Sequence, residues 1–396
     1  MRRHASILRV EVTPCSAQGA RAKMPLVLDY DSTMKLYERC GDKKIVMARI
    51  GYSDQDQIQG IVRGAARFAE DHSIESLPLG IFSTVGHYIL QQLPRYLDAA
   101  HELPADGGDP AAYHRRCIRN ARLAVNFMSI LTEEGDEDFG RVAISHHYDH
   151  GHHTLPGGVV SENELLRQPE FIDLFSSVMF DDTHSPFDDN CRNSADYRAF
   201  LEAEGRKKVL EGCLEEVAAG GDGLDESACT NPDQIEQFLE RTGFELVVPN
   251  IGTESINARQ VGIQWQVLEE IDKRGIGPRL IVHGFSSIKA LEVEQQRRLG
   301  HLGVVGMNAW SYIPQHIGPQ LLERSAKILS SHDEKLGYPV DFDDDGKPVY
   351  SESRDANVFF GPLLDQVRDL KVRLIADSVY EILGNLGYAA FAPDAS

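Results

Sequence analysis

The sequence predicts an α/β fold, a (β/α)8 TIM barrel with a C-terminal helical extension. Eight short apolar segments recur along the chain, segments with helical spacing separate them, and no hairpin turn joins one to the next. Strands that alternate with helices form a parallel sheet, because parallel neighbours need a crossover connection. Eight such strands close a barrel and leave no edge strand unpaired. A doubly wound open sheet would usually carry a glycine-rich turn after its first strand, and no such turn is visible.

The predicted strands are short runs rich in Val, Ile and Leu, of the length typical of buried strands. They are Lys44–Ile50, Leu77–Ser83, Arg141–Gly151, Phe175–Asp181, Val209–Val217, Glu245–Ile251, Arg279–Gly284 and Leu302–Asn308.

Apolar side chains at helical spacing predict the connecting helices, as Ile58, Ile61, Val62 and Ala65 do in the second of them. The predicted helices are Asp31–Cys40, Asp54–Asp71, Ala111–Leu131, Asn163–Leu174, Ala195–Lys208, Asp233–Arg241, Arg259–Lys273 and Ile317–Leu329. A further helical pattern over Gly361–Leu386 is expected to pack on the barrel or on a second subunit. We therefore divide the chain into a loose leader (1–24), a barrel (25–335) and a C-terminal turn with helical extension (336–396).

Composition and charge exclude several classes of partner. The 396 residues carry a formal net charge of −21, which argues against nucleic acid or an anionic membrane, because both need compensating Lys and Arg. No apolar run approaches the roughly 18 residues that span a bilayer. The six cysteines form no CxxC motif, and we interpret them as reduced thiols of a cytoplasmic protein. The leader lacks the apolar core of a secretory signal.

Polar side chains gather at the carboxyl ends of the predicted strands, where TIM barrels carry their active sites. These ends supply Ser83, Asp149, His150, Asp181, Glu216, Glu254 or Ser255, His283 and Asn308. Two histidines and a carboxylate can hold a divalent metal with one position open for substrate. A carboxylate that is not a ligand can shuttle a proton.

Simpler interpretations stay open for some of these residues. Asp181 can cap the following helix, and Glu216 can belong to a hydrated strand end. His147 and the His152-His153 pair are predicted to be surface or loop histidines rather than ligands.

The loops after the seventh and eighth strands are where barrels often bind a phosphate. Gly284 allows close backbone approach there, and Ser286 and Ser287 offer hydroxyl and N–H donors. The two serines can equally be helix caps.

Five motifs together resemble the class II, metal-dependent ketose-bisphosphate (fructose-bisphosphate) aldolases. They occur in the family's order, each on the strand that the family would use, and the resemblance covers roughly residues 25 to 335. The motifs are Tyr148–Gly151, Ser177–His184, Val248–Glu254, Ile281–Ser287 and Gly303–Asn308.

The resemblance implies roles for individual residues. Asp149 would be the proton donor and acceptor, and His150 and His283 would ligate a catalytic zinc ion. Glu216, Asp181 and Glu254 are the candidate acidic residues of the metal site, with Asp181 behind the ligands or at a second cation. Substrate would be held by Ser83, Gly252, Ser255, Gly284, Ser286, Ser287 and Asn308.

The chain also departs from the family pattern. Ser255 stands where the family has a third histidine ligand, Gly306 replaces a lysine, Trp310 replaces an aspartate, and an acidic loop is shortened at 220–225. Either His150, His283 and a carboxylate (Glu216 or Glu254) hold the metal, or metal binding is weakened or lost. The missing basic residues suggest that the substrate is not a bisphosphate.

The leading hypothesis is a metal-dependent aldolase that makes or cleaves an aldol bond through an enediolate of a dihydroxyacetone-phosphate-like or related anionic substrate. The resemblance implies a cytoplasmic enzyme, a divalent cofactor (zinc), a small phosphorylated sugar, aldehyde or ketone as substrate, and a homodimer. Two alternatives remain: a non-catalytic sugar-phosphate-binding barrel or accessory aldolase subunit, and a metal-dependent epimerase or isomerase.

The segment Asp341–Glu352 satisfies the spacing of a calcium-binding loop. Pro348 occupies a position that needs a bonded apolar residue, and no partner hand is evident. We therefore predict a polar turn between two short extended segments instead.

Overall fold

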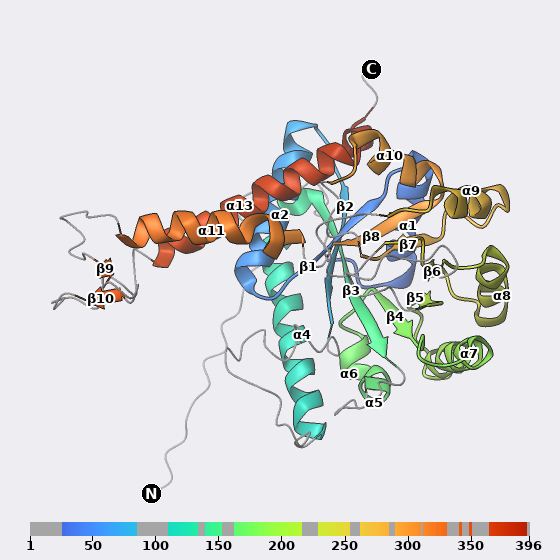
Figure 1. Cartoon of the computed structure of the whole chain (residues 1–396). Coiled ribbons are helices and arrows are strands. Elements are labelled where there is room, and N and C mark those ends of the chain that lie inside the picture. The colour runs from blue at the N-terminus through green and yellow to red at the C-terminus, as the bar shows by residue number, and fades with distance from the viewer. Residues whose placement is uncertain are drawn as a thin grey trace, which may run out of the picture.

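The computed structural model of the chain describes residues 26–84, 110–133, 139–152, 162–215, 229–253, 262–284, 290–309, 312–330, 340–342, 348–350 and 364–393. Within these ranges eight parallel strands pair in sequence order and close into a barrel, with β8 hydrogen-bonded to β1 (Figure 1). The strands are β1 (Met47–Gly51), β2 (Leu77–Ser83), β3 (Val142–His152), β4 (Ser177–Asp181), β5 (Val209–Cys213), β6 (Leu246–Val248), β7 (Leu280–Val282) and β8 (Val304–Ala309). The predicted TIM barrel is confirmed.

Helices alternate with the strands and cover the outside of the barrel (Figure 1). They are α1 (Tyr30–Lys43), α2 (Gln55–Asp71), α4 (Pro110–Glu133), α5 (Glu162–Leu166), α6 (Pro169–Ile172), α7 (Phe187–Ala203), α8 (Pro232–Thr242), α9 (Trp265–Lys273), α10 (Val293–His301), α11 (Tyr312–Ser330) and α13 (Leu364–Asn385). Asp54 and Asn231 cap α2 and α8 by accepting from backbone N–H groups of the first turn.

Several predicted bounds were wrong. The single helix expected over Asn163–Leu174 is two short helices, because Pro169 has no N–H to continue the first and instead begins the second. The helix expected over Ala195–Lys208 begins at Phe187 and ends at Ala203, and β5 ends at Cys213 rather than Val217. Helix α10 was not predicted.

Two layers of apolar packing hold the barrel. The larger lies between the strands and the surrounding helices, and the smaller fills the barrel interior. Side chains from six strands pack together in this smaller cluster: Met47, Ala143, Met179, Val209, Cys213, Leu246, Val248 and Ile281. Polar side chains replace this apolar filling toward the carboxyl ends, where the candidate site lies.

The C-terminal helix α13 packs along α2, as predicted for an extension that covers the barrel. Gly60 and Gly64 of α2 allow this close approach, because a Cβ at Gly64 would lie 2.4 Å from the carbonyl oxygen of Ala376. Helices α11 and α13 run side by side away from the barrel (Figure 1).

Strands β9 (Val340–Phe342) and β10 (Pro348–Tyr350) pair antiparallel near the end of this projection. Two short extended segments are what the turn interpretation of Asp341–Glu352 predicted; residues 343–347 and 351–352 lie outside the described ranges.

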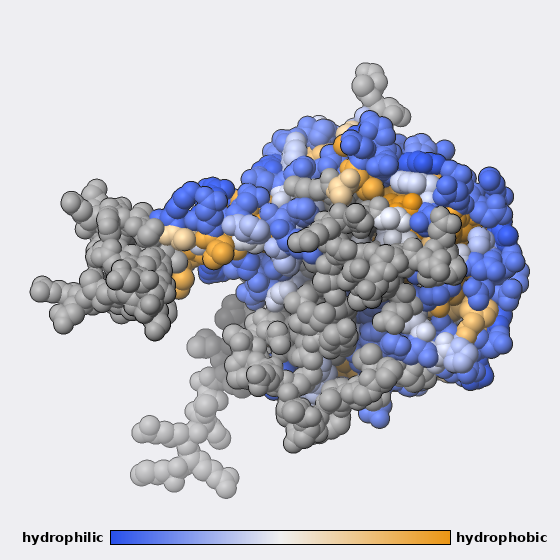
Figure 2. All heavy atoms as spheres, viewed as in Figure 1, coloured by the Kyte–Doolittle hydropathy of each residue, from blue (hydrophilic) through white to orange (hydrophobic). Residues whose placement is uncertain are grey.

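The visible surface is largely hydrophilic, with an apolar strip on the projection of α11 and α13 (Figure 2). Leu322 of α11 is 75% exposed. Of the described helices, none combines the length and the apolar character that crossing a membrane requires.

Candidate active site

A bulge at the end of β3 turns two consecutive side chains toward one site. In a regular strand Asp149 and His150 would point to opposite faces. The β3–β4 register shifts between Tyr148 and Gly151, and His150 adopts φ 50°, in the left-handed region that residues other than glycine rarely occupy. Gly151 makes room for this path, since a Cβ there would lie 2.9 Å from the carbonyl oxygen of Met179.

The rings of His150 and His283 meet across the barrel mouth. His150 Nε2 lies 3.1 Å from His283 Nδ1, and His150 Nδ1 donates to Asp181 Oδ2 at 2.7 Å. Burial alone would lower the pKa of His150, but the carboxylates of Asp149 and Asp181 outweigh it and raise that pKa to about 9. His150 is therefore cationic at neutral pH, with one N–H directed to Asp181 and the other to His283.

This pair fits a divalent metal. Two nitrogen ligands of a tetrahedral zinc ion, each bonded at 2.0–2.1 Å, lie about 3.3 Å apart, close to the separation seen here. A cation can thus replace the proton between the two rings. Ligand atoms of Asp149, His150 and His283 all lie within 4.8 Å of one another, and Asp181 supplies the carboxylate that commonly orients a metal-binding histidine.

Asp149 is buried beside this pair. Asn308 Nδ2 donates to Asp149 Oδ1 at 2.7 Å, and His283 Nε2 lies 3.7 Å from the same oxygen. Burial opposes ionisation, but His150, together with the neighbouring His283 and His147, outweighs it and lowers the pKa of Asp149 well below its usual range. Asp149 is thus an ionised carboxylate, and Asn308 fixes its orientation.

Asp181 ends β4 and accepts three hydrogen bonds. These come from His150 Nδ1, from the backbone N–H of Thr183 and from its hydroxyl. Burial opposes ionisation of Asp181 too, but the hydrogen bond from His150 outweighs it and lowers the pKa. Asp181 thus both supports His150 and closes the turn after β4.

Sequence reasoning missed a buried ion pair inside the barrel. Arg49 Nη1 of β1 donates to Glu211 Oε2 of β5 at 2.6 Å, and both side chains are fully buried. Burial would raise the pKa of Glu211, but Arg49 outweighs it and lowers that pKa to about 2. Glu211 Oε1 lies 3.2 Å from His283 Nε2, and Asn308 Nδ2 lies 2.9 Å from the same nitrogen. The missed signal was a charged residue in the middle of an apolar run, as both Arg49 and Glu211 are.

The surface or loop position predicted for His147 was wrong. His147 is fully buried in the barrel, and its Nδ1 bonds Ser177 Oγ at 2.8 Å. Its Nε2 lies 3.6 Å from Asp149 and 3.9 Å from Glu211. Strand alternation was the available signal, because residues two apart on β3 share a face. His152 is partly buried, with Nδ1 3.5 Å from Asp181, and His153 lies outside the described ranges.

Of the other predicted site residues, the structure describes Ser83, Gly252 and Gly284. Ser83 ends β2 and lies in register with Tyr148 of β3. Because the ring of Tyr148 packs against Phe171 on the helix side of the sheet, Ser83 is favoured on that side as well. Gly252 and Gly284 have φ 87° and 70°, and a Cβ at Gly252 would meet the carbonyl oxygen of Gly262. The residues outside the described ranges are Glu216, Glu254, Ser255, Ser286 and Ser287.

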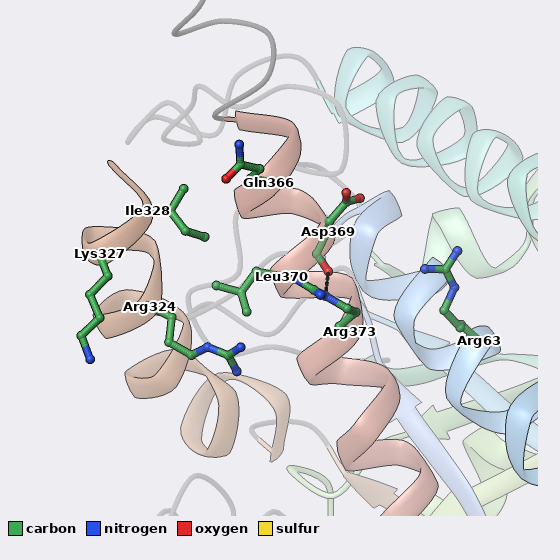
Figure 3. Close-up of a pocket in the computed structure, with 8 residues that line it drawn as sticks. All are labelled: Arg63, Arg324, Lys327, Ile328, Gln366, Asp369, Leu370 and Arg373. Carbon is green, nitrogen blue, oxygen red and sulfur yellow. Dashed lines mark hydrogen bonds between the residues drawn. The ribbon is translucent and has the colours of Figure 1, made fainter. Parts of the chain in front are cut away.

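A surface pocket lies elsewhere, between α2, α11 and α13 (Figure 3). Basic side chains dominate its lining: Arg63, Arg324, Lys327 and Arg373. None of the clustered residues at the strand ends lines it.

Comparisons with known proteins indicate both a family and a shared fold. A family model described as Fructose-bisphosphate aldolase class-II matches residues 31–334. The chain is 24% identical over 250 residues to a fructose-bisphosphate aldolase of Treponema pallidum, covering 54% of this chain and 68% of that one. It is 28% identical over 260 residues to a fructose-bisphosphate aldolase of Thermus caldophilus, covering 63% and 77%. The solved structure of a fructose-bisphosphate aldolase from Campylobacter jejuni shares the fold, with a TM-score of 0.64 at 16% identity over 91% of this chain and 96% of that one.

Proposed function

Because the chain belongs to the class II fructose-bisphosphate aldolase family, a family of lyases, we propose that it makes or cleaves an aldol bond with a divalent metal at His150 and His283. One observation carries the proposal: Asp149 and His150 of β3, Asn308 of β8 and His283, which directly follows β7, converge in a largely buried cluster at the carboxyl ends of the barrel. Zinc is the metal we expect, because nitrogen ligands and an open position suit a catalytic zinc ion.

The metal would supply a Lewis acid for the carbonyl and hydroxyl oxygens of the substrate, which favours an enediolate without a Schiff-base lysine. The protein's own groups handle the proton. Asp149 Oδ1 already accepts a hydrogen bond from Asn308 Nδ2. We therefore assign proton transfer at the substrate hydroxyl to Asp149 Oδ2. We also propose that the carboxylate of Glu216 or Glu254 provides the third ligand of the metal.

We further propose that the substrate carries fewer anionic groups than a bisphosphate. Among the described residues, the arginine beside the cluster is Arg49, and both of its terminal nitrogens already contact Glu211. The glycine at 306 removes another site for a cation near the cluster. A dihydroxyacetone-phosphate-like compound with one phosphate, or another ketone with one anionic group, suits this charge balance.

The proposal is tested by metal analysis of the purified protein, followed by an aldol-cleavage assay over a panel of ketose mono- and bisphosphates. We expect about one divalent ion per chain at neutral pH and cleavage of a monophosphate. Asp149→Asn should keep the metal and lower kcat by about 10²–10⁴-fold, the usual contribution of a general acid–base. Absence of stoichiometric metal, or full activity of Asp149→Asn, would refute the proposed mechanism.

A further inference from the structure

Arg49 occupies a space that two neighbouring strands leave for it. A Cβ at Gly80 of β2 would lie 2.3 Å from Arg49 Cγ, and a Cβ at Gly306 of β8 would lie 3.3 Å from Arg49 Cδ. Both strands flank β1, and Arg49 pairs in register with Gly80. The interior of the barrel therefore accommodates the arginine because Gly80, beside its Cγ, and Gly306, beside its Cδ, carry no side chain.

The arginine reaches across the barrel to one carboxylate. Its two terminal nitrogens lie 2.6 and 3.4 Å from the two oxygens of Glu211, and neither side chain is exposed. A forked guanidinium holds a carboxylate in both position and rotation, which a point charge does not do. The orientation of Glu211 is thus set by Arg49.

Glu211 in turn contacts His283. Its Oε1 lies 3.2 Å from His283 Nε2, and Asn308 Nδ2 lies 2.9 Å from the same nitrogen. When Nε2 carries the proton and donates to Glu211, the Nδ1 lone pair of the ring faces His150. Asp181 stands in the corresponding place behind His150, where it accepts from Nδ1 and leaves Nε2 to face His283. Each histidine therefore has a carboxylate on one nitrogen, and the two remaining nitrogens lie 3.1 Å apart.

We propose that Arg49 is a positioning residue of the metal site: through Glu211 it fixes the tautomer and the ring orientation of His283. The inference rests on the proposed function, because it concerns metal binding by His150 and His283. Carboxylates behind metal-binding histidines typically change metal affinity by about 10–100-fold when they are removed. Arg49 adds a further link, since its guanidinium contacts both oxygens of Glu211 and so holds the carboxylate toward His283.

A merely structural ion pair would behave differently. Its loss would lower the stability of the fold but leave the affinity for metal and the electronic environment of the bound ion unchanged. Metal affinity, measured on folded protein, therefore separates the two roles without an activity assay.

The experiment titrates Zn²⁺ against a competing chelator and records the visible spectrum of the Co²⁺-loaded protein, for the wild type, Arg49→Met, Glu211→Gln and the double variant. We expect each single variant to lose about 10–100-fold in Zn²⁺ affinity and to shift the Co²⁺ spectrum. The double variant should lose no more than Glu211→Gln alone, because Arg49 acts through Glu211. Arg49→Lys should recover part of the loss.

Arg198→Met is the matched control. It removes an arginine that also bonds a carboxylate at 2.6 Å, Glu245, on the outside of the barrel. It should leave both readouts unchanged. If Arg49→Met does not fold, Glu211→Gln, which keeps the size of the side chain, tests the chain of contacts by itself.

The outcomes separate the two proposals. A wild type that binds neither ion overturns the proposed function. The wild type can bind the ions while the folded Arg49→Met and Glu211→Gln proteins show the same affinity and the same spectrum. That result overturns the inference on Arg49 and leaves the proposed function standing.

Discussion

His150 shows at the scale of one residue how the site is built. Its positive φ places it next to Asp149 on the same side of β3, and Asp181 then binds its Nδ1. A non-glycine residue in the left-handed region costs free energy and is found most often where function requires it. The hydrogen bond from His150 Nδ1 to Asp181 compensates this strain, which makes that carboxylate the natural residue to test.

Asp181→Asn should weaken the affinity for Zn²⁺ by about 10–100-fold, because the amide no longer fixes the tautomer of His150 as the carboxylate does. Chelator competition measures the change. The neighbouring Asp182→Asn is the control, since Asp182 accepts hydrogen bonds from Ser185 and Asn193. Equal affinities in the two variants would mean that Asp181 only closes the turn after β4.

His146 is a buried neutral histidine on the opposite face of β3. Its Nδ1 donates to the carbonyl oxygen of Leu174 at 2.8 Å, its Nε2 accepts from the hydroxyl of Tyr52 at 3.2 Å, and its ring stacks on Phe175. Burial, assisted by the nearby His147, lowers its pKa to about 4. In the unfolded chain a histidine takes up its proton near pH 6.5.

The unfolded state therefore binds more protons than the folded state between pH 6.5 and 4. The stabilisation is fully present above pH 6.5 and is lost as the pH falls toward 4. His146→Gln should reduce the pH dependence of the unfolding free energy in this window by up to about 1.4 kcal/mol per pH unit. Urea denaturation at several pH values measures it, and identical slopes for both proteins would contradict the assignment.

At the scale of elements, the close crossing of α2 and α13 depends on glycine. A Cβ at Gly64 would approach both the carbonyl oxygen and the Cα of Ala376, which are backbone atoms and cannot turn away. The two helices can pack at this distance only because α2 has no side chain there.

Gly64→Ala should therefore lower the unfolding free energy by about 1–3 kcal/mol, the usual cost of overpacking. Gly384→Ala in α13 is the matched control, because its Cβ would meet only Phe68 Cε2 at an ordinary 3.7 Å. In a helix that control should be neutral or gain up to about 1 kcal/mol. Chemical denaturation of both variants distinguishes them, and a Gly64→Ala protein as stable as the control would show that the helices can move apart freely.

At the scale of the whole molecule, the C-terminal end of the chain is bonded to the first strand. The hydroxyl of Tyr388 accepts from the backbone N–H of Ala48 in β1 at 2.7 Å, and both residues are fully buried. The residues are 340 positions apart, so the extension is part of the folded barrel rather than an appendage.

Tyr388→Phe should cost about 1–3 kcal/mol of stability, because it leaves the buried N–H of Ala48 without an acceptor. Tyr380→Phe is the comparison, since the hydroxyl of Tyr380 bonds Asp71 in an exposed position and its loss should cost little. Thermal or urea unfolding measures both. Equal stabilities would show that Ala48 finds another partner.

Particular residues show how far the sequence alone reached. Asp149, His150, His283 and Asn308 could be placed together, because all four follow or end apolar runs and the carboxyl ends of barrel strands share one face. Asp181 was recognised as an acid at a strand end, but its hydrogen bond to His150 Nδ1 depends on the bulge in β3. His147 was misplaced because a run of polar residues at a strand end does not show which members turn inward.

The order and spacing of the elements determined the closed barrel, since eight parallel strands with helical crossovers have few other ways to bury both faces. Only the tertiary structure decided the partnership of Arg49 and Glu211. They lie 162 positions apart, and their contact depends on the glycines at 80 and 306 on the strands beside Arg49. Local patterns set which face a side chain occupies, whereas the closing of the barrel sets which side chains meet across its interior.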